Sequence, residues 1–313
     1  MDGVPELSSG RTAKESFGPY ELLGELGRGG AGVVFRARQR SPDRTVALKV
    51  VSQFCFGSSR ERQRFLSEAA IASRIVHRGI VPVYEIGTHE GRDYYTMELE
   101  EGGNLKDRLA EGPLEPRDAV KLLIQLCDAV HHAHEQGVVH RDLKPANVLF
   151  DTAGHPRISD FGLAKDVSAQ QELTLTGEVV GTPSYMAPEQ IAGSAEIGPA
   201  TDVYALGCVL YTCLTGQPPS RAASVPATLH QILETPPVPT RFANPSVPRD
   251  LDAIALKCLE KRAEHRYPSA RALADDLRAF LEGRPIQADD GRTNAFLRLL
   301  AQETRHTDVM ARW

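Results

Sequence analysis

The sequence predicts an α+β fold of two lobes, a small antiparallel β-sheet lobe with one helix and a larger helical lobe, with a cleft between them. Short β-rich runs broken by turn residues occupy residues 20–99. Stretches with a helical spacing of apolar residues dominate from residue 119 onward. Between them, Glu101-Gly102-Gly103 interrupts the pattern and predicts the boundary between the lobes.

The small lobe is expected to contain five strands and one helix. The helix is predicted over residues 60–75, where Phe65, Ile71 and Ile75 are among the apolar positions. Residues 1–17 are mostly polar and predict a flexible arm before the first strand. The predicted strands cover residues 20–26, 33–38, 45–51, 81–86 and 94–99.

The large lobe is expected to be helical. A long periodic stretch over residues 119–136 ends at Gly137, a residue that favours helix termination. The Pro-rich stretch at residues 236–248 predicts a loop. Further helices are predicted over residues 200–215, 250–261 and 269–281.

Composition and charge exclude several classes of protein. Hydrophobic residues make up 41% and charged residues 25%, as in soluble globular proteins. The net charge of −5 gives no general attraction to nucleic acid or to anionic lipid. The apolar run over residues 203–214 is too short to span a bilayer and predicts a core helix.

The cysteines and the N-terminus indicate the cytoplasm. The cysteines are five in number, and no two form a C-x-x-C pair, which disfavours a disulfide framework or a zinc site. Residues 1–17 lack the apolar segment of a signal peptide. We therefore expect a cytoplasmic protein whose cysteines are small buried hydrophobes.

A glycine-rich segment at residues 27–34 matches the pattern G-x-G-x-x-G-x-V. Glycines allow the backbone to approach phosphates closely and to expose its N–H groups to them. An ordinary hairpin turn would also explain the segment. A dinucleotide-binding fold would place a helix directly after the glycines, whereas residues 33–38 predict a strand.

Three further motifs contain groups suited to phosphate chemistry. Residues 140–147 combine an acid, a lysine and an amide oxygen, which makes them the strongest single signal in the chain, and the alternative is a charged surface loop. Asp160, in Asp160-Phe161-Gly162, could bind Mg²⁺, although that tripeptide is also typical of an ordinary turn. Lys49 lies in an apolar predicted strand, where a lysine usually faces solvent, and Glu68 on the next predicted helix could pair with it. The tripeptide at residues 187–189, Ala-Pro-Glu, means little alone.

Taken together, the order and spacing of these motifs resemble the eukaryotic-like (Hanks-type) serine/threonine protein kinases of bacteria. The resemblance implies a catalytic domain over residues 18–283, composed of an N-lobe (18–97), a hinge (98–103) and a C-lobe (104–283). Residues 284–313 would form a C-terminal tail or connector. The implied activity is transfer of the γ-phosphoryl group of ATP to serine or threonine hydroxyls of proteins.

The resemblance also implies a role for each site residue. Asp142 would orient and deprotonate the attacking hydroxyl, and Lys144 would contact the γ-phosphate. Lys49, positioned by Glu68, would hold the α- and β-phosphates. Mg²⁺, or Mn²⁺ as an alternative, would bind Asn147 and Asp160. The implied ATP-binding residues are Leu26, Gly27, Gly29, Gly32, Val34, Ala47, Lys49, the gatekeeper Met97, the hinge residues Glu98 and Glu100, and Leu149.

Structural roles follow from the same resemblance. Glu189 and Arg266 would form a buried ion pair, Asp202 would hold the catalytic-loop backbone, and His140 and Phe161 would be two members of a stacked core column. Arg141 would stay unpaired until a phosphate arrives at Thr174 and Thr176, the implied sites of activating phosphorylation. The groove positions that select basic substrates in this family are uncharged here, namely Asn104, Ala146 and Thr212.

Two other functions remain open at this point. One is a pseudokinase scaffold, although such chains usually lack one of Lys49, Asp142 and Asp160. The other is a small-molecule phosphotransferase, which would not need the peptide-facing segment Gly181-Thr182-Pro183. The expected partners are protein substrates and a transient second copy for autophosphorylation. The tail would lead to a membrane anchor in a longer parent chain.

Overall fold

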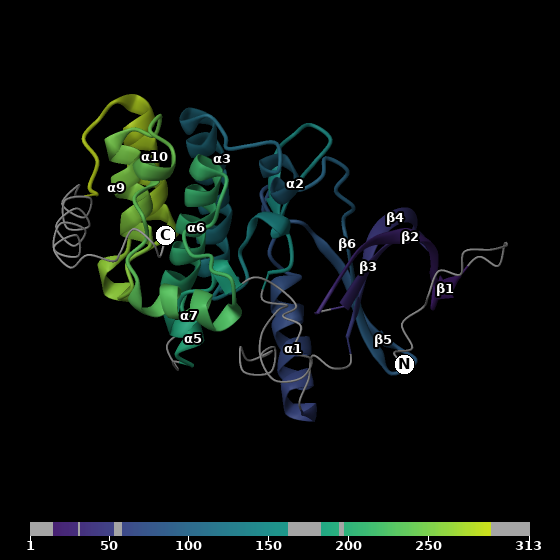
Figure 1. The fold of residues 1–313 in the computed structure, drawn as a ribbon. Helices are drawn as coiled ribbons and strands as arrows, with labels where there is room; N and C mark the ends of the chain where they lie inside the picture. Colours follow the sequence, from purple (N-terminus) through teal and green to yellow (C-terminus); the bar gives the residue numbers. More distant parts are fainter. Residues whose placement is uncertain (1–14, 31, 53–57, 162–182, 194–196, 289–313) are drawn as a thin grey trace.

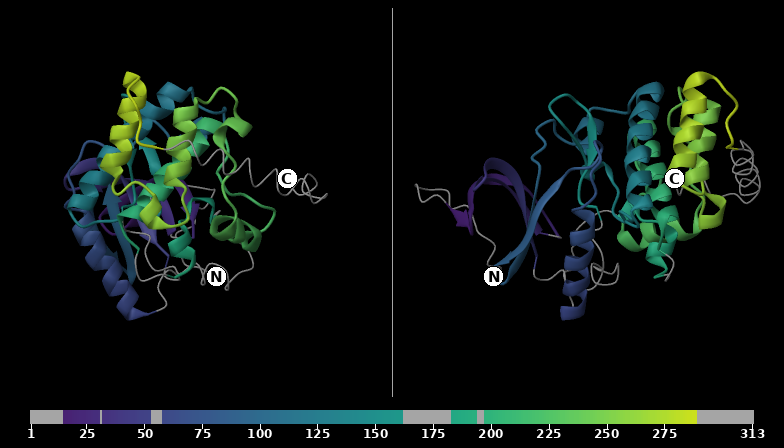
Figure 2. Two further views of the ribbon diagram at one scale, coloured as in Figure 1. Left: turned by 90° about the vertical axis from the view of Figure 1, so that its left-hand side faces the viewer. Right: turned by 180° about the vertical axis from the view of Figure 1, so that it is seen from behind.

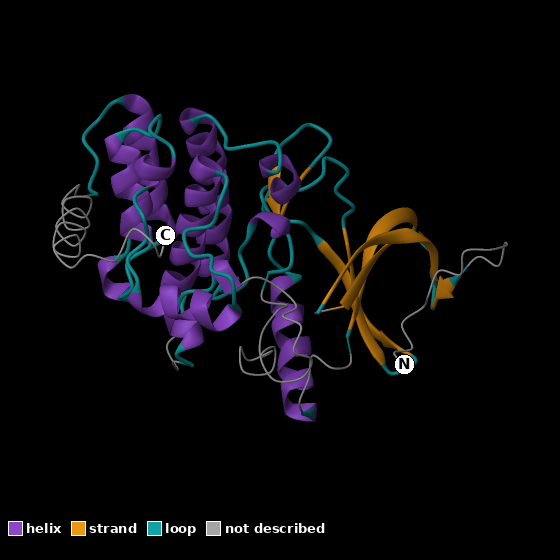
Figure 3. Cartoon of the chain, viewed as in Figure 1, coloured by secondary structure: helices purple, strands orange, loops and turns teal. Residues whose placement is uncertain are grey.

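The computed structural model describes residues 15–30, 32–52, 58–161, 183–193 and 197–288. Figure 1 shows two lobes, with the strands gathered in one and most helices in the other. The colouring in Figure 3 separates the strand-rich part from the helix-rich part in the same way. The predicted α+β, two-lobed architecture is therefore confirmed.

The small lobe is a six-stranded sheet with the order β1-β2-β3-β4-β6-β5, in which all neighbours are antiparallel. All five predicted strands are present, within a few residues of their predicted bounds. A core of aromatic and aliphatic side chains, including Tyr20, Phe35 and Leu48, fills one face. The strands are β1 Ser16–Phe17, β2 Tyr20–Gly29, β3 Gly32–Arg40, β4 Asp43–Val51, β5 Val83–His89 and β6 Arg92–Met97.

Strand β1 corrects the prediction of an arm that extends to residue 17. Ser16 and Phe17 pair with Glu21 and Tyr20, and the Phe17 ring is buried. That ring makes an edge contact with Tyr94, with 5.4 Å between the ring centroids. A pairing of two residues is too short to leave a periodic pattern, so this strand could not be predicted from the sequence.

Helix α1, Ser59–Ala72, lies between the sheet and the large lobe in both Figure 1 and Figure 2. Phe65 and Ala69 pack on the sheet beside Val51 and Tyr95. The helix ends three residues before its predicted end, because Arg74 N and Ile75 N bond to carbonyls three residues back rather than four.

The large lobe contains the four predicted helices and several short ones. The unpredicted α8 lies inside the predicted loop at 236–248, because Thr240 N and Thr240 Oγ1 both donate to Asp252 Oδ1, each at 2.7 Å. The helices are α2 Leu105–Leu109, α3 Pro116–Glu135, α5 Pro188–Ile191, α6 Pro199–Thr215, α7 Val225–Glu234, α8 Thr240–Ala243, α9 Arg249–Cys258 and α10 Ala270–Glu282. A hairpin of β7 Val148–Phe150 and β8 Pro156–Ile158 joins them, with 3-10 turns at Pro145–Asn147, Pro183–Tyr185 and Ala263–His265.

Helix α6 is the centre of the large lobe. Its residues from Thr201 to Leu214 are all buried, which confirms the predicted core helix, and α3, α9 and α10 pack around it. A methyl group on Gly207 would overlap the Cβ atom of Cys258, so glycine permits the close approach of α9. Within the described residues, no helix is both long and apolar enough to cross a membrane.

The predicted state of the cysteines is confirmed for the four that the structure describes. Cys127, Cys208, Cys213 and Cys258 are buried and form no disulfide. Cys55 lies outside the described residues.

Candidate active site

The glycine-rich segment forms the hairpin between β2 and β3, and a strand follows it as predicted. Gly32 has a φ of 137°, and a side chain there would overlap the carbonyl oxygen of Val50. The backbone therefore requires glycine at this position. A Cβ atom on Gly27 or Gly29 would meet no atom of the described residues within 4 Å. Packing does not explain these two glycines, and they leave room above the hairpin.

Below the hairpin, both lobes contribute to one apolar cluster. Val34, Ala47 and Met97 come from the sheet, with Ala47 directly opposite Met97 on the neighbouring strand. Leu149 comes from β7 of the large lobe and packs against the same cluster. Leu26, at the start of the hairpin, is half exposed. These predicted ATP-binding residues therefore line the junction of the two lobes.

The hinge acids point toward β8. Arg157 Nη1 lies 2.9 Å from Glu98 Oε2 and 3.0 Å from Glu100 Oε1. Burial and the nearby Glu98 charge raise the pKa of Glu100, although Arg157 opposes the shift. The Glu98 amide donates to Pro82 O at 3.0 Å. Arg157 was not predicted from the sequence, because β8 lies far from the hinge along the chain.

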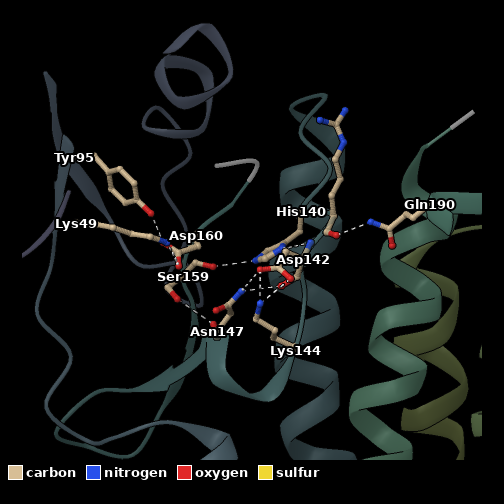
Figure 4. Close-up of polar contacts among 10 residues, drawn as sticks. Lys49, Tyr95, His140, Asp142, Lys144, Asn147, Ser159, Asp160 and Gln190 are labelled. Atoms are coloured by element: carbon tan, nitrogen blue, oxygen red, sulfur yellow. Dashed lines mark hydrogen bonds and ion pairs between the residues drawn. The ribbon is translucent and has the colours of Figure 1, made fainter. Parts of the chain in front are cut away.

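The predicted catalytic acid lies in a polar network (Figure 4). Lys144 Nζ is 2.7 and 2.9 Å from the two carboxylate oxygens of Asp142. Asn147 Nδ2 donates to the Asp142 carbonyl at 2.8 Å and to its carboxylate at 3.1 Å. Asn147 O in turn accepts from Ser159 N at 2.9 Å, which joins this loop to the residue before Asp160.

Asp202 holds the backbone of the loop, as predicted. Its carboxylate accepts from His140 N at 2.8 Å and from Arg141 N at 2.9 Å, and His134 Nε2 lies 2.7 Å away. Burial raises the pKa of Asp202, but the contact with His134 and the amide donors outweigh it and lower the pKa overall. Phe161 makes an edge contact with the His140 ring, with 4.6 Å between centroids, so the two predicted members of the core column meet edge to face rather than stacked.

The predicted metal ligand Asp160 contacts the small lobe. Lys49 Nζ lies 2.8 Å from Asp160 Oδ2, and the hydroxyl of Tyr95 donates to Oδ1. Lys49 and Tyr95 are opposite each other on β4 and β6, so one cross-strand pair holds the carboxylate. Burial raises the pKa of Asp160, but Lys49 and Tyr95 outweigh it and lower the pKa overall. Tyr95 was not predicted from the sequence, although the pairing of the two strands could have indicated it.

Glu68 corrects two expectations. Its carboxylate lies 3.0 Å from Arg141 Nη1, while Lys49 bonds to Asp160. Glu68 was expected to pair with Lys49, and Arg141 was expected to be unpaired. The position of α1 places the Glu68 carboxylate against the catalytic loop of the large lobe, so the guanidinium that precedes Asp142 becomes its partner.

The predicted ion pair behind the site is confirmed. Arg266 Nη1 and Nη2 lie 2.7 and 2.8 Å from the two oxygens of Glu189, and Thr201 Oγ1 adds a bond of 2.9 Å. Burial raises the pKa of Glu189, but the Arg266 contact outweighs it and lowers the pKa overall. The predicted phosphorylation sites Thr174 and Thr176 lie outside the described residues, as does the segment 181–182.

The sequence matches the family model described as "Protein kinase domain" over residues 20–277. This chain belongs to the protein kinase family. The chain resembles several serine/threonine-protein kinases of bacteria. It is 42% identical over 264 residues to the DNA damage-responsive serine/threonine-protein kinase RqkA of Deinococcus radiodurans, covering 82% of this chain and 39% of the relative.

Two mycobacterial kinases are also similar to this kinase. Serine/threonine-protein kinase PknD of Mycobacterium tuberculosis is 40% identical over 275 residues, covering 87% of this chain and 40% of the relative. PknB of Mycobacterium leprae is 35% identical over 281 residues, covering 88% of this chain and 45% of the relative. The chain thus spans less than half the length of these relatives.

The fold also matches that of a solved kinase. The crystal structure of the Mycobacterium tuberculosis PknI kinase domain has a TM-score of 0.69 and 25% identity to this chain, covering 86% of this chain and 98% of that one. The kinase fold is therefore supported by both the sequence and the structure comparison.

Proposed function

We propose that this chain transfers the γ-phosphoryl group of ATP to serine and threonine hydroxyls of proteins. The observation that carries the proposal is the convergence of four groups at the lobe junction. Lys49 lies 2.8 Å from Asp160, Asn147 donates to Asp142, and Asn147 O accepts from Ser159, which precedes Asp160. A pseudokinase usually lacks at least one of Lys49, Asp142 and Asp160, and this chain has all three.

In the proposed reaction, Asp142 accepts the proton of the substrate hydroxyl and orients its oxygen toward the phosphorus. Lys144 lies beside it and neutralises charge on the transferred group. The two contacts from Asn147 and Lys144 fix the Asp142 carboxylate before substrate arrives. Such preorganisation lowers the cost of reaching the transition state.

The residues present fit Mg²⁺, with Mn²⁺ as an alternative. Asn147 uses its Nδ2 group as a donor to Asp142, which leaves Oδ1 as the atom of that side chain able to ligate. Asp160 supplies a carboxylate whose lowered pKa keeps it ionised at neutral pH. When bound, the ion neutralises charge between the β- and γ-phosphates.

ATP would occupy the lobe junction. The adenine would lie between Ala47 and Leu149, which share one apolar cluster from opposite lobes. The hinge would meet the adenine edge through its backbone, since the side chains of Glu98 and Glu100 bond to Arg157. The open space above Gly27 and Gly29 suits the phosphates.

We extend the proposal to the organisation of the chain. Residues 18–283 form the catalytic domain, to whose sheet strand β1 at Ser16–Phe17 is added, and residues 284–313 form a tail or connector. Thr174 and Thr176 are the sites of activating autophosphorylation, for which two copies meet transiently. The catalytic domain acts in the cytoplasm, and tethering to a membrane would come through a segment beyond the connector.

The test is a transfer assay with purified, phosphatase-treated protein and labelled ATP. We expect Mg²⁺-dependent labelling of serine and threonine in a generic protein substrate. Asp142→Asn should lose most turnover while nucleotide binding persists, because Asp142 acts on the hydroxyl. Lys49→Met should lower turnover through lost phosphate orientation.

Three outcomes would reject parts of the proposal. Nucleotide binding without transfer would indicate a pseudokinase, and transfer to small molecules alone would indicate a different phosphotransferase. If Asp142→Asn retained wild-type turnover, the assignment of the catalytic acid would be wrong.

A further inference from the structure

The side-chain amide of Gln190 joins two separate parts of the large lobe. Gln190 Nε2 donates to the carbonyl oxygen of Arg141 at 2.7 Å. Gln190 Oε1 accepts from Ala187 N at 2.9 Å. Because a carbonyl can only accept and an amide N–H can only donate, these two partners fix which way the side-chain amide faces.

The bond to Arg141 acts on the peptide group that precedes Asp142. The carbonyl of Arg141 and the N–H of Asp142 belong to the same planar unit. Gln190 holds its oxygen, and His140 Nδ1 accepts from its N–H at 3.2 Å. The orientation of this plane sets the direction in which the Asp142 side chain leaves the backbone.

This peptide group needs support, because Arg141 has a left-handed φ of 69°. A non-glycine residue in that region costs of the order of 1 kcal/mol or more and persists only where its surroundings enforce it. Asp202 secures the N–H of Arg141, at 2.9 Å, and Gln190 secures its carbonyl. Both ends of the strained residue are therefore held by side chains from other elements.

Gln190 is itself held in place by its neighbour. Both residues lie on the short helix α5, and Glu189 forms the buried ion pair with Arg266. One residue thus attaches α5 to the body of the lobe, and the next reaches the catalytic loop.

We propose that Gln190 is a positioning residue for phosphoryl transfer, which sets the direction of the Asp142 carboxylate by holding the Arg141–Asp142 peptide group. The inference rests on the proposed function. Gln190 also links the Ala187-Pro188-Glu189 segment to the catalytic loop, so that a displacement of α5 would change the orientation of the Asp142 side chain.

The test uses two variants that separate the bonds of the amide. Gln190→Glu keeps an acceptor for Ala187 N and loses the donor to Arg141 O, whereas Gln190→Met loses both without adding charge. We expect kcat to fall about tenfold or more in both variants, because misplaced catalytic groups are costly. The KM for ATP should stay within about twofold, since Asp142 acts on the hydroxyl.

Gln125→Glu is the matched control. Gln125 Nε2 also donates to a backbone carbonyl, that of Lys121 at 3.3 Å, but on the surface of α3. This variant should retain wild-type kcat. Melting temperatures of all variants are measured in the same buffer, and loss of cooperative melting in both Gln190 variants would show a role in fold stability instead.

Further outcomes would overturn the inference. A folded Gln190→Met with kcat within twofold of the wild type would show that the hydrogen bond from Gln190 to the Arg141 carbonyl is not needed. An active Gln190→Glu together with an impaired Gln190→Met would show the same. An active wild type with active variants rejects this inference alone, whereas a wild type that transfers no phosphate rejects the proposed function and this inference together.

Discussion

The Glu68 carboxylate on α1 bonds to the Arg141 guanidinium of the catalytic loop, with 3.0 Å between Oε2 and Nη1. At the same time Lys49 Nζ bonds to Asp160. Glu68 is therefore paired with Arg141, whereas the proposed reaction requires its pairing with Lys49. Asp160 is paired with Lys49, whereas the proposed reaction requires it to bind a metal ion. A phosphothreonine would compete for Arg141, because phosphate offers a strong charge-assisted partner to a guanidinium. Glu68 would then be released toward Lys49, and Asp160 toward the metal.

The first prediction concerns this competition. In the wild type, phosphorylation at Thr174 and Thr176 should raise kcat by roughly tenfold or more, because charge-assisted hydrogen bonds to a phosphate are strong. In Arg141→Gln the ratio of phosphorylated to dephosphorylated kcat should fall toward one. The measurement is initial rate before and after autophosphorylation. Arg278→Gln, which removes the Arg278–Asp128 pair, should retain the wild-type ratio. An unchanged ratio in Arg141→Gln would contradict the prediction.

The second prediction concerns Tyr95, whose hydroxyl donates to Asp160. Tyr95→Phe removes a hydrogen bond that a metal ion must displace. The Mg²⁺ concentration for half-maximal activity should fall roughly fivefold, equivalent to about 1 kcal/mol. A Mg²⁺ titration at saturating ATP measures it. Tyr84→Phe, on the same sheet, is the control, and an equal or higher Mg²⁺ requirement in Tyr95→Phe would disprove the idea.

The third prediction concerns stability. Arg266→Ala leaves the Glu189 carboxylate without its principal cation in a mostly buried site. We expect the free energy of unfolding to fall by about 3–5 kcal/mol. Urea denaturation measures the change. Arg262→Ala removes an exposed pair with Glu264 and should have almost no effect. Similar losses in the two variants would argue against this account.

The fourth prediction concerns pH. Burial raises the pKa of Asp202, but its contacts lower it overall, so the folded value lies below that of the unfolded chain. Its contribution to stability is complete above about pH 4, the value for a free aspartate, and is lost as the pH falls through the lower folded value. At pH 7 Asp202→Asn should be less stable by about 2–4 kcal/mol. The difference from the wild type should shrink as denaturation is repeated below pH 4. A difference in unfolding free energy between the two proteins that stays constant from about pH 7 to below about pH 4 would refute this prediction.

The fifth prediction concerns substrate choice. Two acids near the substrate groove are paired in the structure, Glu100 with Arg157 and Glu101 with Arg36. Asn104 caps α2, and it carries no charge. An arginine two or three residues before the target therefore gains little energy. A peptide array should show no dominant arginine there, whereas Arg36→Ala should increase arginine selection by exposing Glu101. Strong arginine selection by the wild type would contradict this expectation.

The sequence predicted what short-range spacing determines. Asp142 and Asn147 lie five residues apart, so one loop places them together whatever the rest of the chain does. The strands around Lys49 followed from short β-rich runs that turn residues interrupt. Residue identities in motifs also indicated the Glu189–Arg266 pair, through the family resemblance.

Contacts that depend on the position of α1 could not be predicted in this way. The partner of Glu68 depends on where α1 lies relative to the catalytic loop, and in the structure that partner is Arg141. The contributions of Tyr95, Arg157 and Gln190 depend on strand register or on loops that meet in space. None of these three residues belongs to a motif that the sequence analysis recognised, so only the assembled fold revealed them.

The burial of α6 on all sides has a consequence for synthesis on the ribosome. Helix α3 emerges before α6, but α9 and α10, which cover its other sides, are made after it. At typical rates of translation, the stretch from Thr215 to Glu282 takes on the order of several seconds. During that interval the most apolar helix of the large lobe is only partly covered. The sheet of the small lobe can already be complete, so the nascent chain exposes a site for chaperones in one lobe while the other is folded.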